Sequence, residues 1–504
     1  MTSEDVPTVA NGTATDRGPA VDARRQLDRS LARGVAWTGT VRWLTQLATW
    51  ASTLVVVRLL TPEDYGLVGL ATLYLGVVTM LSEFGIGTTV IALRELTPDQ
   101  HAQINTLSMM FGVAAFAVSC AAAPLLARFF DAPELTRIVI AMASVFVVTG
   151  ARVVPQALLQ REMRFRDLAF NDGLQAVVLA TGSVVFALLG FRYWTLVLSA
   201  LLAAVLSTLG VLRLVRVPFH RPQWRALAPA LTFSRHTLLS RLAWYAYQNA
   251  DFLVVGRLFG KELTGVYRVA WDLTSTPIEK ITAMVSRVTP AVLSAAQHDR
   301  PALRRYLLRI TEALAVVTFP ATVGMGLVAR DLVPLLLTEK WAAMVLPLQL
   351  LAVAAAVRSV TPMLPQVLTV IGENRRVMHQ NVVGAIVMPL AFWAGSRWGT
   401  VGIAAMWLAV YPVAVVGPMG RAVFRQLHMR GADYGRALAP AVTGVVMMSL
   451  LVWGVRWAMP IELERPVRLA MDIGVGAAGY CLALLVFFRS RVAALVAGVR
   501  AARA

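Results

Sequence analysis

The sequence contains little cysteine and little charge. Only two cysteines, Cys120 and Cys481, occur in 504 residues, and they lie far apart inside apolar runs. This excludes a disulfide framework and a CxxC metal or redox site. Charged residues make up 15% of the chain and apolar residues 57%. A soluble protein of this length could not cover its surface with so few polar groups, so the composition predicts an integral membrane protein.

Motifs for nucleotides, metals and catalysis are also missing. There is no GxxxxGK[ST] segment, and the six histidines are isolated and show no HExxH spacing. The GVGAAG run at Gly474–Gly479 matches GxGxxG but follows no predicted strand. We interpret it as close helix packing through small residues. We therefore expect no ATPase, no cofactor, no bound metal and no enzymatic activity in this chain.

The net charge of +19 comes almost entirely from arginine, since lysine occurs only at Lys261, Lys280 and Lys340. The basic residues are scattered in short segments between apolar runs, which argues against a nucleic-acid partner. Their distribution instead predicts topology. About 27 Lys and Arg fall in the N-terminal tail, the even-numbered loops and the C-terminus, against about 12 on the other side. Both termini are therefore expected in the cytoplasm.

Apolar runs of about 20 residues predict roughly fourteen membrane spans joined by short loops. The spans begin near residues 34, 66, 104, 136, 169, 193, 232, 264, 308, 341, 379, 399, 436 and 467. The loops leave no room for an extramembrane catalytic domain. Residues 1–33 contain no apolar segment, so we expect a disordered cytoplasmic tail and not a signal peptide.

An internal repeat is visible at an offset of 199 residues. Residues 41–71 match residues 240–270 with ten identities in 31 positions. The informative identities are Arg42/Arg241, Arg58/Arg257, Glu63/Glu262 and Gly66/Gly265. Matches between apolar residues arise easily by chance in membrane helices, but these polar and glycine pairs in one register do not. The offset skips six spans, so the two halves share one orientation, related by an axis along the membrane normal.

The expected fold is therefore an all-α membrane protein with two six-helix lobes around a central cavity. The N-lobe covers residues 34–216, a cytoplasmic linker covers 217–231, and the C-lobe covers 232–424. Two further helices follow at 435–488, and a basic cytoplasmic tail at 489–504.

Polar residues recur at helical spacing on four of the spans. An arginine near the bilayer centre costs about 2.5–3.5 kcal/mol, so it must face a wet cavity, pair with an acid or reach the interface. The stripes are Thr38, Arg42, Thr45, Gln46, Thr49 and Thr53; Thr72, Gly76, Thr79 and Glu83; Arg241, Tyr245, Gln248 and Asp251; and Arg268, Asp272, Ser275, Glu279, Thr282 and Ser286. We expect them to meet across a shared lumen. The alternative is buried ion pairing, most obviously between Arg268 and Asp272.

A basic lumen predicts an anionic substrate, because the planar guanidinium group binds phosphate with two parallel hydrogen bonds and stays charged when partly desolvated. The acids on the same stripes are candidates for coupling to protons or sodium, since burial and neighbouring arginines shift their protonation in opposite directions. These acids are Glu83, Asp251, Asp272 and Glu279.

Several segments resemble one transporter family over essentially the whole chain. They are RLLTPEDYG at Arg58–Gly66, FFDAP at Phe129–Pro133, QREMRF at Gln160–Phe165, and the series Asn249, Asp251, Gly256, Arg257, Gly265 and Tyr267. In these segments the chain is similar to the Wzx-type polysaccharide and O-antigen flippases of the multidrug/oligosaccharidyl-lipid/polysaccharide exporter superfamily.

The resemblance implies a V-shaped exporter in the bacterial cytoplasmic membrane. It would move polyprenyl-pyrophosphate-linked oligosaccharide from the inner to the outer leaflet by ion-coupled alternating access, for lipopolysaccharide or exopolysaccharide synthesis. It implies anion contact for Arg42, Arg241, Arg268 and Arg358. The expected partners are the lipid-linked glycan, membrane lipids, a polysaccharide polymerase and glycosyltransferases, with the monomer as the functional unit.

Three other functions stay open. A lipid II flippase would look almost identical in sequence. A multidrug or cation exporter of the same superfamily would favour an acidic or apolar pocket, which the arginine excess argues against. A membrane glycosyltransferase or polymerase would need a sizeable outer loop, and none is long enough.

Overall fold

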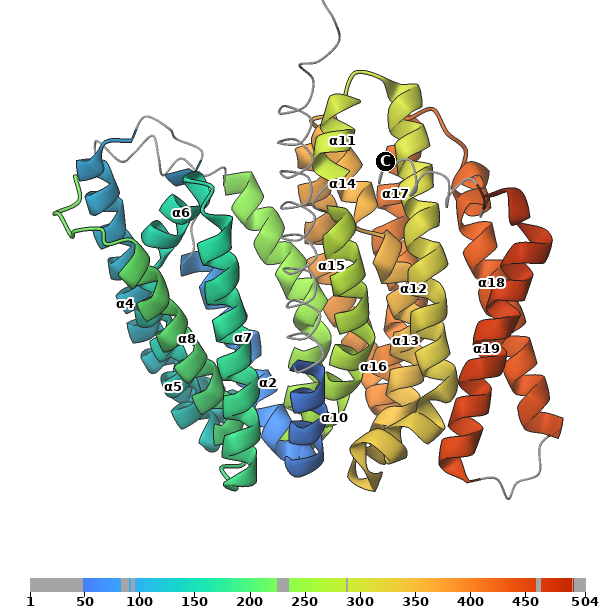
Figure 1. Cartoon of the computed structure of the whole chain (residues 1–504), viewed down its shortest axis with the longest axis horizontal. Helices are drawn as coiled ribbons and strands as arrows, with labels where there is room; N and C mark the ends of the chain where they lie inside the picture. The colour runs from blue at the N-terminus through green and yellow to red at the C-terminus, as the bar shows by residue number, and fades with distance from the viewer. Residues whose placement is uncertain are drawn as a thin grey trace, which may run out of the picture.

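The structure is a computed structural model that describes residues 49–82, 90–91, 96–223, 235–286, 289–458, 464–491 and 493. Within these segments every regular element is a helix (Figure 1). The all-α fold expected from the sequence is confirmed. The predicted tail of residues 1–33, together with Arg42 and Glu83, lies outside the described residues.

The helices form two groups and a C-terminal pair (Figure 1). The N-lobe contains a helix at Thr49–Leu59, followed by α2 (Pro62–Ser82), α4 (Pro98–Phe129), α5 (Glu134–Gly150), α6 (Val153–Arg161), α7 (Phe165–Leu188) and α8 (Trp194–Leu214). The C-lobe contains α10 (Arg235–Ser286), α11 (Thr289–Ala295), α12 (Arg300–Leu337), η1 (Glu339–Met344), α13 (Val345–Val360), α14 (Met363–Val370), α15 (Asn374–Gly395), η2 (Ser396–Trp398), α16 (Gly399–Ala409), η3 (Pro412–Val416) and α17 (Gly417–Gln426). The pair consists of α18 (Gly431–Ala458) and α19 (Arg465–Phe487).

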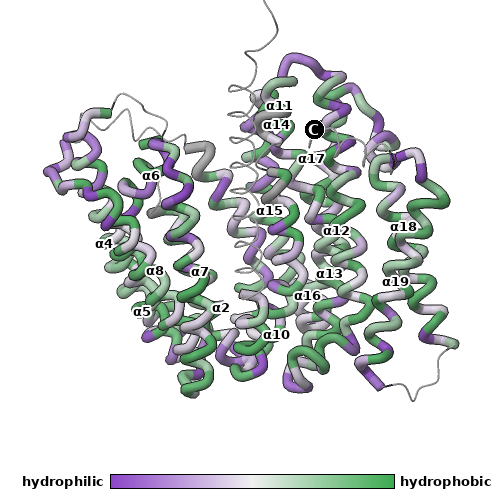
Figure 2. Tube along the Cα trace, in the orientation of Figure 1, coloured by the Kyte–Doolittle hydropathy of each residue, from purple (hydrophilic) through white to green (hydrophobic). Residues whose placement is uncertain are grey.

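Hydrophobic residues run along the middle of these helices, and hydrophilic residues gather toward their ends (Figure 2). Within the described segments, nine helices are long and apolar enough to cross a membrane, or ten if the bent pair α5–α6 is one span. The protein is thus a multi-pass membrane protein. Helix α10, where the sequence predicts two spans, is not among the nine, because its charged stripe lowers its hydropathy. The total of fourteen spans stays a prediction.

Helix α10 is interrupted at Gly260, whose φ of 78° lies outside the helical region. Glycine adopts this left-handed backbone without the steric cost that a side chain would impose. The break divides α10 into residues 235–259 and 261–286, which the sequence predicts as separate spans. We refer to this side of the molecule as the Gly260 end.

The two lobes repeat the same series of turns. In each lobe a residue with a positive φ precedes the fourth, the fifth and the sixth long helical segment, if the broken pairs α5–α6 and α13–α14 each count as one segment and the short α11 and η1 are left out. The residues are Asp131, Met163 and Arg192 in the N-lobe and Thr338, Gly372 and Gly399 in the C-lobe. A helix break also recurs, between α5 and α6 and again between α13 and α14. This pattern agrees with the internal repeat.

The repeat is clearest where α2 meets α10. A Cβ atom on Gly66 would lie 1.7 Å from the carbonyl oxygen of Lys261, and a Cβ atom on Gly265 would lie 1.7 Å from that of Pro62. Gly66 corresponds to Gly265, and Pro62 to Lys261, at the offset of 199 residues. The glycine of each helix therefore contacts the equivalent carbonyl group of the other helix. Such reciprocity is the mark of an interface with two-fold symmetry. Small residues allow membrane helices to approach this closely.

Polar contacts join the lobes at the Gly260 end. Arg58 donates from Nε to the carbonyl oxygen of Leu336 at 2.6 Å. Its counterpart in the repeat, Arg257, places its guanidinium carbon 5.6 Å from the ring centre of Phe129. Each arginine therefore reaches the C-terminal end of a long helix in the opposite lobe, α12 or α4.

A lysine adds an ionic link at the same end. Nζ of Lys261 in α10 lies 2.7 Å from Oε1 of Glu63 and 2.8 Å from Oε1 of Glu134, both in the N-lobe. The indole nitrogen of Trp341 donates to the carbonyl oxygen of Val57 at 3.1 Å. In Figure 1 the N-lobe helices lean away from the C-lobe toward the top of the view and approach it at the bottom.

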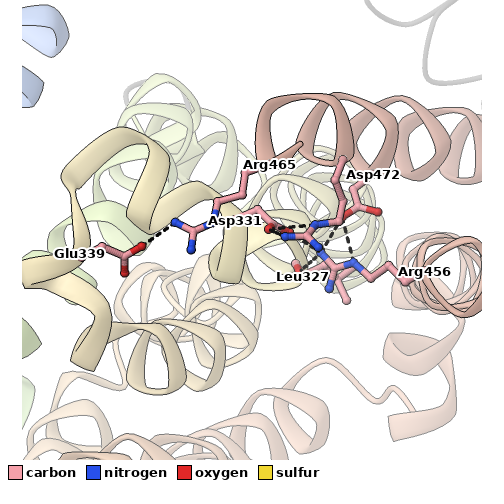
Figure 3. Close-up of polar contacts among 7 residues, drawn as sticks. Leu327, Asp331, Glu339, Arg456, Arg465 and Asp472 are labelled. Carbon is pink, nitrogen blue, oxygen red and sulfur yellow. Dashed lines mark hydrogen bonds and ion pairs between the residues drawn. The ribbon is translucent and has the colours of Figure 1, made fainter. Parts of the chain in front are cut away.

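The C-terminal pair is fixed to α12 by ion pairs (Figure 3). Arg456 of α18 donates from Nε to Asp472 of α19 at 2.9 Å and from a terminal nitrogen to the carbonyl oxygen of Leu327 in α12, also at 2.9 Å. Arg468 of α19 donates from Nε to Asp331 of α12 at 3.0 Å. Asp331 also lies 3.8 Å from Arg456, whereas Asp472 is almost fully buried and is held by Arg456. The loss of Arg456 would therefore leave an uncompensated charge within the bundle.

We predict that Gly66→Ala and Gly265→Ala destabilise the protein to a similar extent. The added methyl group would meet a carbonyl oxygen at 1.7 Å in both cases, and overpacking of this kind typically costs about 1–3 kcal/mol. Gly454→Ala in α18 is the control, because nothing lies within 4 Å of its added Cβ. Thermal unfolding of the detergent-purified variants measures the effect. Unequal losses in the two variants would contradict the reciprocal contact.

Candidate functional site

A polar cavity of about 890 Å³ opens within the C-lobe. Its wall is built by both halves of α10, by α13 and α14 around their break, by α15, and by the segment that joins α16 to α17. The lining residues are Trp244, Tyr247, Gln248, Asn249, Arg268, Trp271, Asp272, Ser275, Thr276, Ile278, Glu279, Thr282, Arg358, Thr361, Pro362, Pro365, Gln366, Thr369, Val370, Asn381, Tyr411, Val415 and Met419.

The stripe that the sequence predicts on residues 261–286 faces this cavity. Its members Arg268, Asp272, Ser275, Glu279 and Thr282 all line the wall. Ser286, the sixth member, has no described side chain. A spacing of three or four residues therefore located one side of the cavity correctly, because such residues share one face of a helix.

Arg268 and Asp272 form the ion pair that the sequence analysis held as an alternative to a free cationic lumen. Nε of Arg268 lies 3.0 Å from Oδ2 of Asp272. The guanidinium carbon also lies 5.2 Å from the ring centre of Phe252. Both charged residues line the cavity, so the pair presents a positive and a negative group side by side.

Arg358 enters the cavity from α13. Its guanidinium carbon lies 3.7 Å from the ring centre of Trp271 and 5.2 Å from that of Trp407. Arginine stacks on indole rings because the plane of the guanidinium matches the negatively polarised face of the ring. The two terminal nitrogens lie 3.5 Å from the hydroxyl of Ser275.

The charges on the described wall balance. Two arginines, Arg268 and Arg358, face two acids, Asp272 and Glu279, and the other lining residues are neutral. The sequence predicts a cationic lumen, and the excess of positive charge is not found among the described residues of this cavity.

Asp251 lies behind the wall and not in it. Its side chain is fully buried. Oδ2 accepts a hydrogen bond from the hydroxyl of Tyr267 at 3.0 Å and another from the indole nitrogen of Trp407 at 2.9 Å. Oδ1 accepts from the backbone N–H of Phe252 at 2.9 Å. A buried carboxylate needs such donors, because an unpaired charge is expensive to remove from water.

Other predicted site residues lie elsewhere. Arg241 is described but does not line the cavity, and Arg42 and Glu83 are outside the described residues. Tyr245 donates to the carbonyl oxygen of Leu73 in α2 at 2.9 Å, so it joins the two lobes. Within the stripe on α2, Thr72 and Thr79 each donate to a carbonyl oxygen of their own helix. This cavity thus has no lining residue from α2.

The lining residues Trp244 and Gln366 were missed by the sequence analysis. Trp244 is 43% exposed and precedes Gln248 by one turn on α10. Oε1 of Gln366 has no hydrogen-bond partner among the described residues. A search for charged residues at helical spacing misses both. Trp244 lies four positions before Gln248, a residue of the predicted stripe, and this spacing was the signal that could have identified Trp244.

Metal ligands do not gather in the described segments, where no group of three or more His, Cys, Asp or Glu side chains is placed to hold an ion.

The model of the family described as "Polysaccharide biosynthesis protein" matches residues 55–346. The chain belongs to this family. One relative is the teichuronic acid biosynthesis protein TuaB of Bacillus subtilis (strain 168), which is 23% identical over 417 residues, with 80% of this chain and 84% of TuaB covered. The lipopolysaccharide biosynthesis protein WzxC of Escherichia coli (strain K12) is 24% identical over 314 residues, with 61% and 63% covered.

The fold of this chain also matches a solved structure. The lipid II flippase MurJ, in an inward closed conformation, superposes with a TM-score of 0.69 at 10% identity, covering 91% of this chain and 100% of MurJ. At this identity the likeness shows the fold alone. The family match, TuaB and WzxC confirm the resemblance to Wzx-type flippases that the sequence motifs indicate.

We predict that Tyr267→Phe destabilises the protein, because it removes one of the donors to buried Asp251 and leaves the ring in place. An unsatisfied buried acceptor costs about 1–3 kcal/mol. Tyr306→Phe, on a side chain that is 38% exposed, is the matched control. The midpoint of thermal unfolding in detergent should fall for Tyr267→Phe alone, and an unchanged midpoint would mean that the hydroxyl does not support the carboxylate.

Proposed function

We propose that the protein is a flippase that moves lipid-linked oligosaccharide from the inner to the outer leaflet of the bacterial cytoplasmic membrane. It is a transporter and not an enzyme. The observation that carries this proposal is the charged and polar cavity along α10, within the fold and family of polysaccharide flippases. A polar headgroup crossing the bilayer needs such a wall, because lipid offers it no hydrogen bonds.

The proposed direction depends on topology. With both termini in the cytoplasm, as the arginine distribution predicts, the Gly260 end faces outward. The contacts of Arg58, Lys261 and Trp341 across the lobes then close the outer side. Release of the glycan would require these contacts to break while the lobes rock about the contact between Gly66 and Gly265.

We assign the pyrophosphate to the arginines of the repeat, Arg42 and Arg241. Arg268 and Arg358 remain candidates for anion contact at the cavity wall, where Arg268 is paired with Asp272. An arginine that is paired with an acid has less positive potential to offer to a phosphate group. Arg42 and Arg241 are equivalent positions of the repeat, one in each half of the chain, so we place the pyrophosphate between arginines of opposite lobes.

Ion coupling is part of the proposal, with Glu83, Asp251, Asp272 and Glu279 as the candidate carboxylates. Asp251 is favoured among the three described acids, because it is fully buried and its oxygens are held by Tyr267 and Trp407. Trp407 connects it to the wall, because its indole nitrogen donates to Asp251 at 2.9 Å and its ring centre lies 5.2 Å from the guanidinium carbon of Arg358. Loss of the Asp251 charge would change the field at the wall, which is how a carboxylate couples ion binding to substrate binding.

The proposed partners are the glycosyltransferases that build the lipid-linked glycan and the polymerase that consumes it. We propose that the monomer is sufficient for transport, because both lobes and the cavity are present in one chain.

We predict that Arg42→Ala and Arg241→Ala abolish surface glycan in the native host while the protein inserts at normal abundance. Arg→Lys at either position should restore part of the export, since lysine keeps the charge but lacks the bidentate fork. Arg397→Ala, on an exposed side chain of η2, is the matched control. Surface glycan is measured by immunoblotting, with membrane protein quantified in parallel. Normal export in both alanine variants would refute the assignment.

A further inference from the structure

The wall of the C-lobe cavity has an excess of hydrogen-bond acceptors over free cationic donors. Asp272 and Glu279 contribute carboxylate oxygens, and the lining residue Gln366 has a buried Oε1 that lacks a partner among the described residues. Arg268 is engaged by Asp272 at 3.0 Å, and Arg358 is stacked on Trp271 at 3.7 Å.

Phosphate oxygens fit this wall poorly. An ionised phosphate only accepts hydrogen bonds, so it would compete with the carboxylates of the wall for the two arginines. A hydroxyl group both donates one hydrogen bond and accepts two. Hydroxyl groups can therefore satisfy the carboxylates and Gln366 and also accept from the arginines.

Aromatic rings supply the second feature. Trp244 is 43% exposed at the cavity wall, while the other lining aromatics, Tyr247, Trp271 and Tyr411, are nearly buried. An indole face is negatively polarised and attracts the weakly positive C–H groups that cover one face of a pyranose ring. Gln248 lies one turn further along α10, where its amide can reach the hydroxyl groups at the ring edge.

We propose that the C-lobe cavity is the binding site for the glycan part of the substrate, with Trp244 as the stacking surface and Gln366 as a hydroxyl acceptor. The ligand class is a sugar ring with several hydroxyl groups and no phosphate. The cavity of about 890 Å³ is within the range of about 300–1,000 Å³ that is typical of small-molecule sites. This inference rests on the proposed flippase function and divides its substrate between two places, with the pyrophosphate left to Arg42 and Arg241.

The experiment uses two probes on the purified full-length protein in nanodiscs. The first is the free oligosaccharide, obtained by mild acid hydrolysis of the lipid-linked intermediate that accumulates when the gene is deleted in the host. Hydrolysis removes the pyrophosphate together with the lipid. The second is polyprenyl pyrophosphate without sugar. Binding of each probe is measured by isothermal titration calorimetry to the wild-type protein and to Trp244→Ala, Trp244→Phe and Gln366→Leu.

We expect the free oligosaccharide to bind the wild-type protein and to bind about tenfold more weakly to Trp244→Ala and Gln366→Leu. Trp244→Phe should keep most of the affinity, because the aromatic face remains. Trp393→Ala on α15, a tryptophan that is 61% exposed and outside the cavity lining, should bind normally. Polyprenyl pyrophosphate should bind all five proteins equally.

Two results would overturn the proposal: an oligosaccharide that does not bind or that binds every variant equally, and a loss of polyprenyl pyrophosphate affinity in Trp244→Ala. Failure of the flippase function itself looks different. In that case no lipid-linked intermediate accumulates in the deletion strain, and both the function and this inference are contradicted. Accumulation of the intermediate with no binding of the free oligosaccharide contradicts the inference alone.

Discussion

The close approach of α2 and α10 at Gly66 and Gly265 is the constraint on which the rest of the structure depends. Neither position has room for a Cβ atom, since each would lie 1.7 Å from a carbonyl oxygen of the other helix. The contact fixes the distance between the lobes. With this contact on one face of α10, the polar stripe that begins at Arg268 faces the C-lobe cavity.

The membrane environment explains how the charged groups are arranged. In lipid an unpaired charge costs several kcal/mol, so charged side chains need partners or water. Arg268 is paired with Asp272 one turn away on the same helix, and Arg358 lies over the rings of Trp271 and Trp407. The same rule acts at the C-terminal pair, where Arg456 and Asp472 hold α18 against α19. The cavity is thereby polar without a net charge on its described wall, which is a property suited to a hydroxylated ligand.

The sequence predicts those features that depend on spacing along one helix. The stripe from Arg268 to Thr282 and the ion pair with Asp272 follow from 3.6 residues per turn, and the repeat follows from identities at one offset. Contacts between helices could not be predicted in the same way. Arg358 meets Trp271 across α13 and α10, and Gln366 reaches the cavity only because α14 is set off from α13 by a break. Tyr245, placed on a lumen stripe by spacing, instead bonds to Leu73 because α2 packs against that face.

The central claim is that the lobes move relative to each other about the glycine contact, with the Gly260 end closed in this conformation. The most direct test links Glu134→Cys to Lys261→Cys with a short bifunctional thiol reagent, in a background with Cys120 and Cys481 removed, and measures glycan flipping in proteoliposomes. The control links Glu339→Cys to Arg465→Cys, an ion pair at 2.5 Å that does not cross between the lobes. The account predicts that the first link stops flipping until it is cleaved by reductant and that the control link leaves flipping intact. Undiminished flipping with Glu134→Cys and Lys261→Cys fully linked would contradict it.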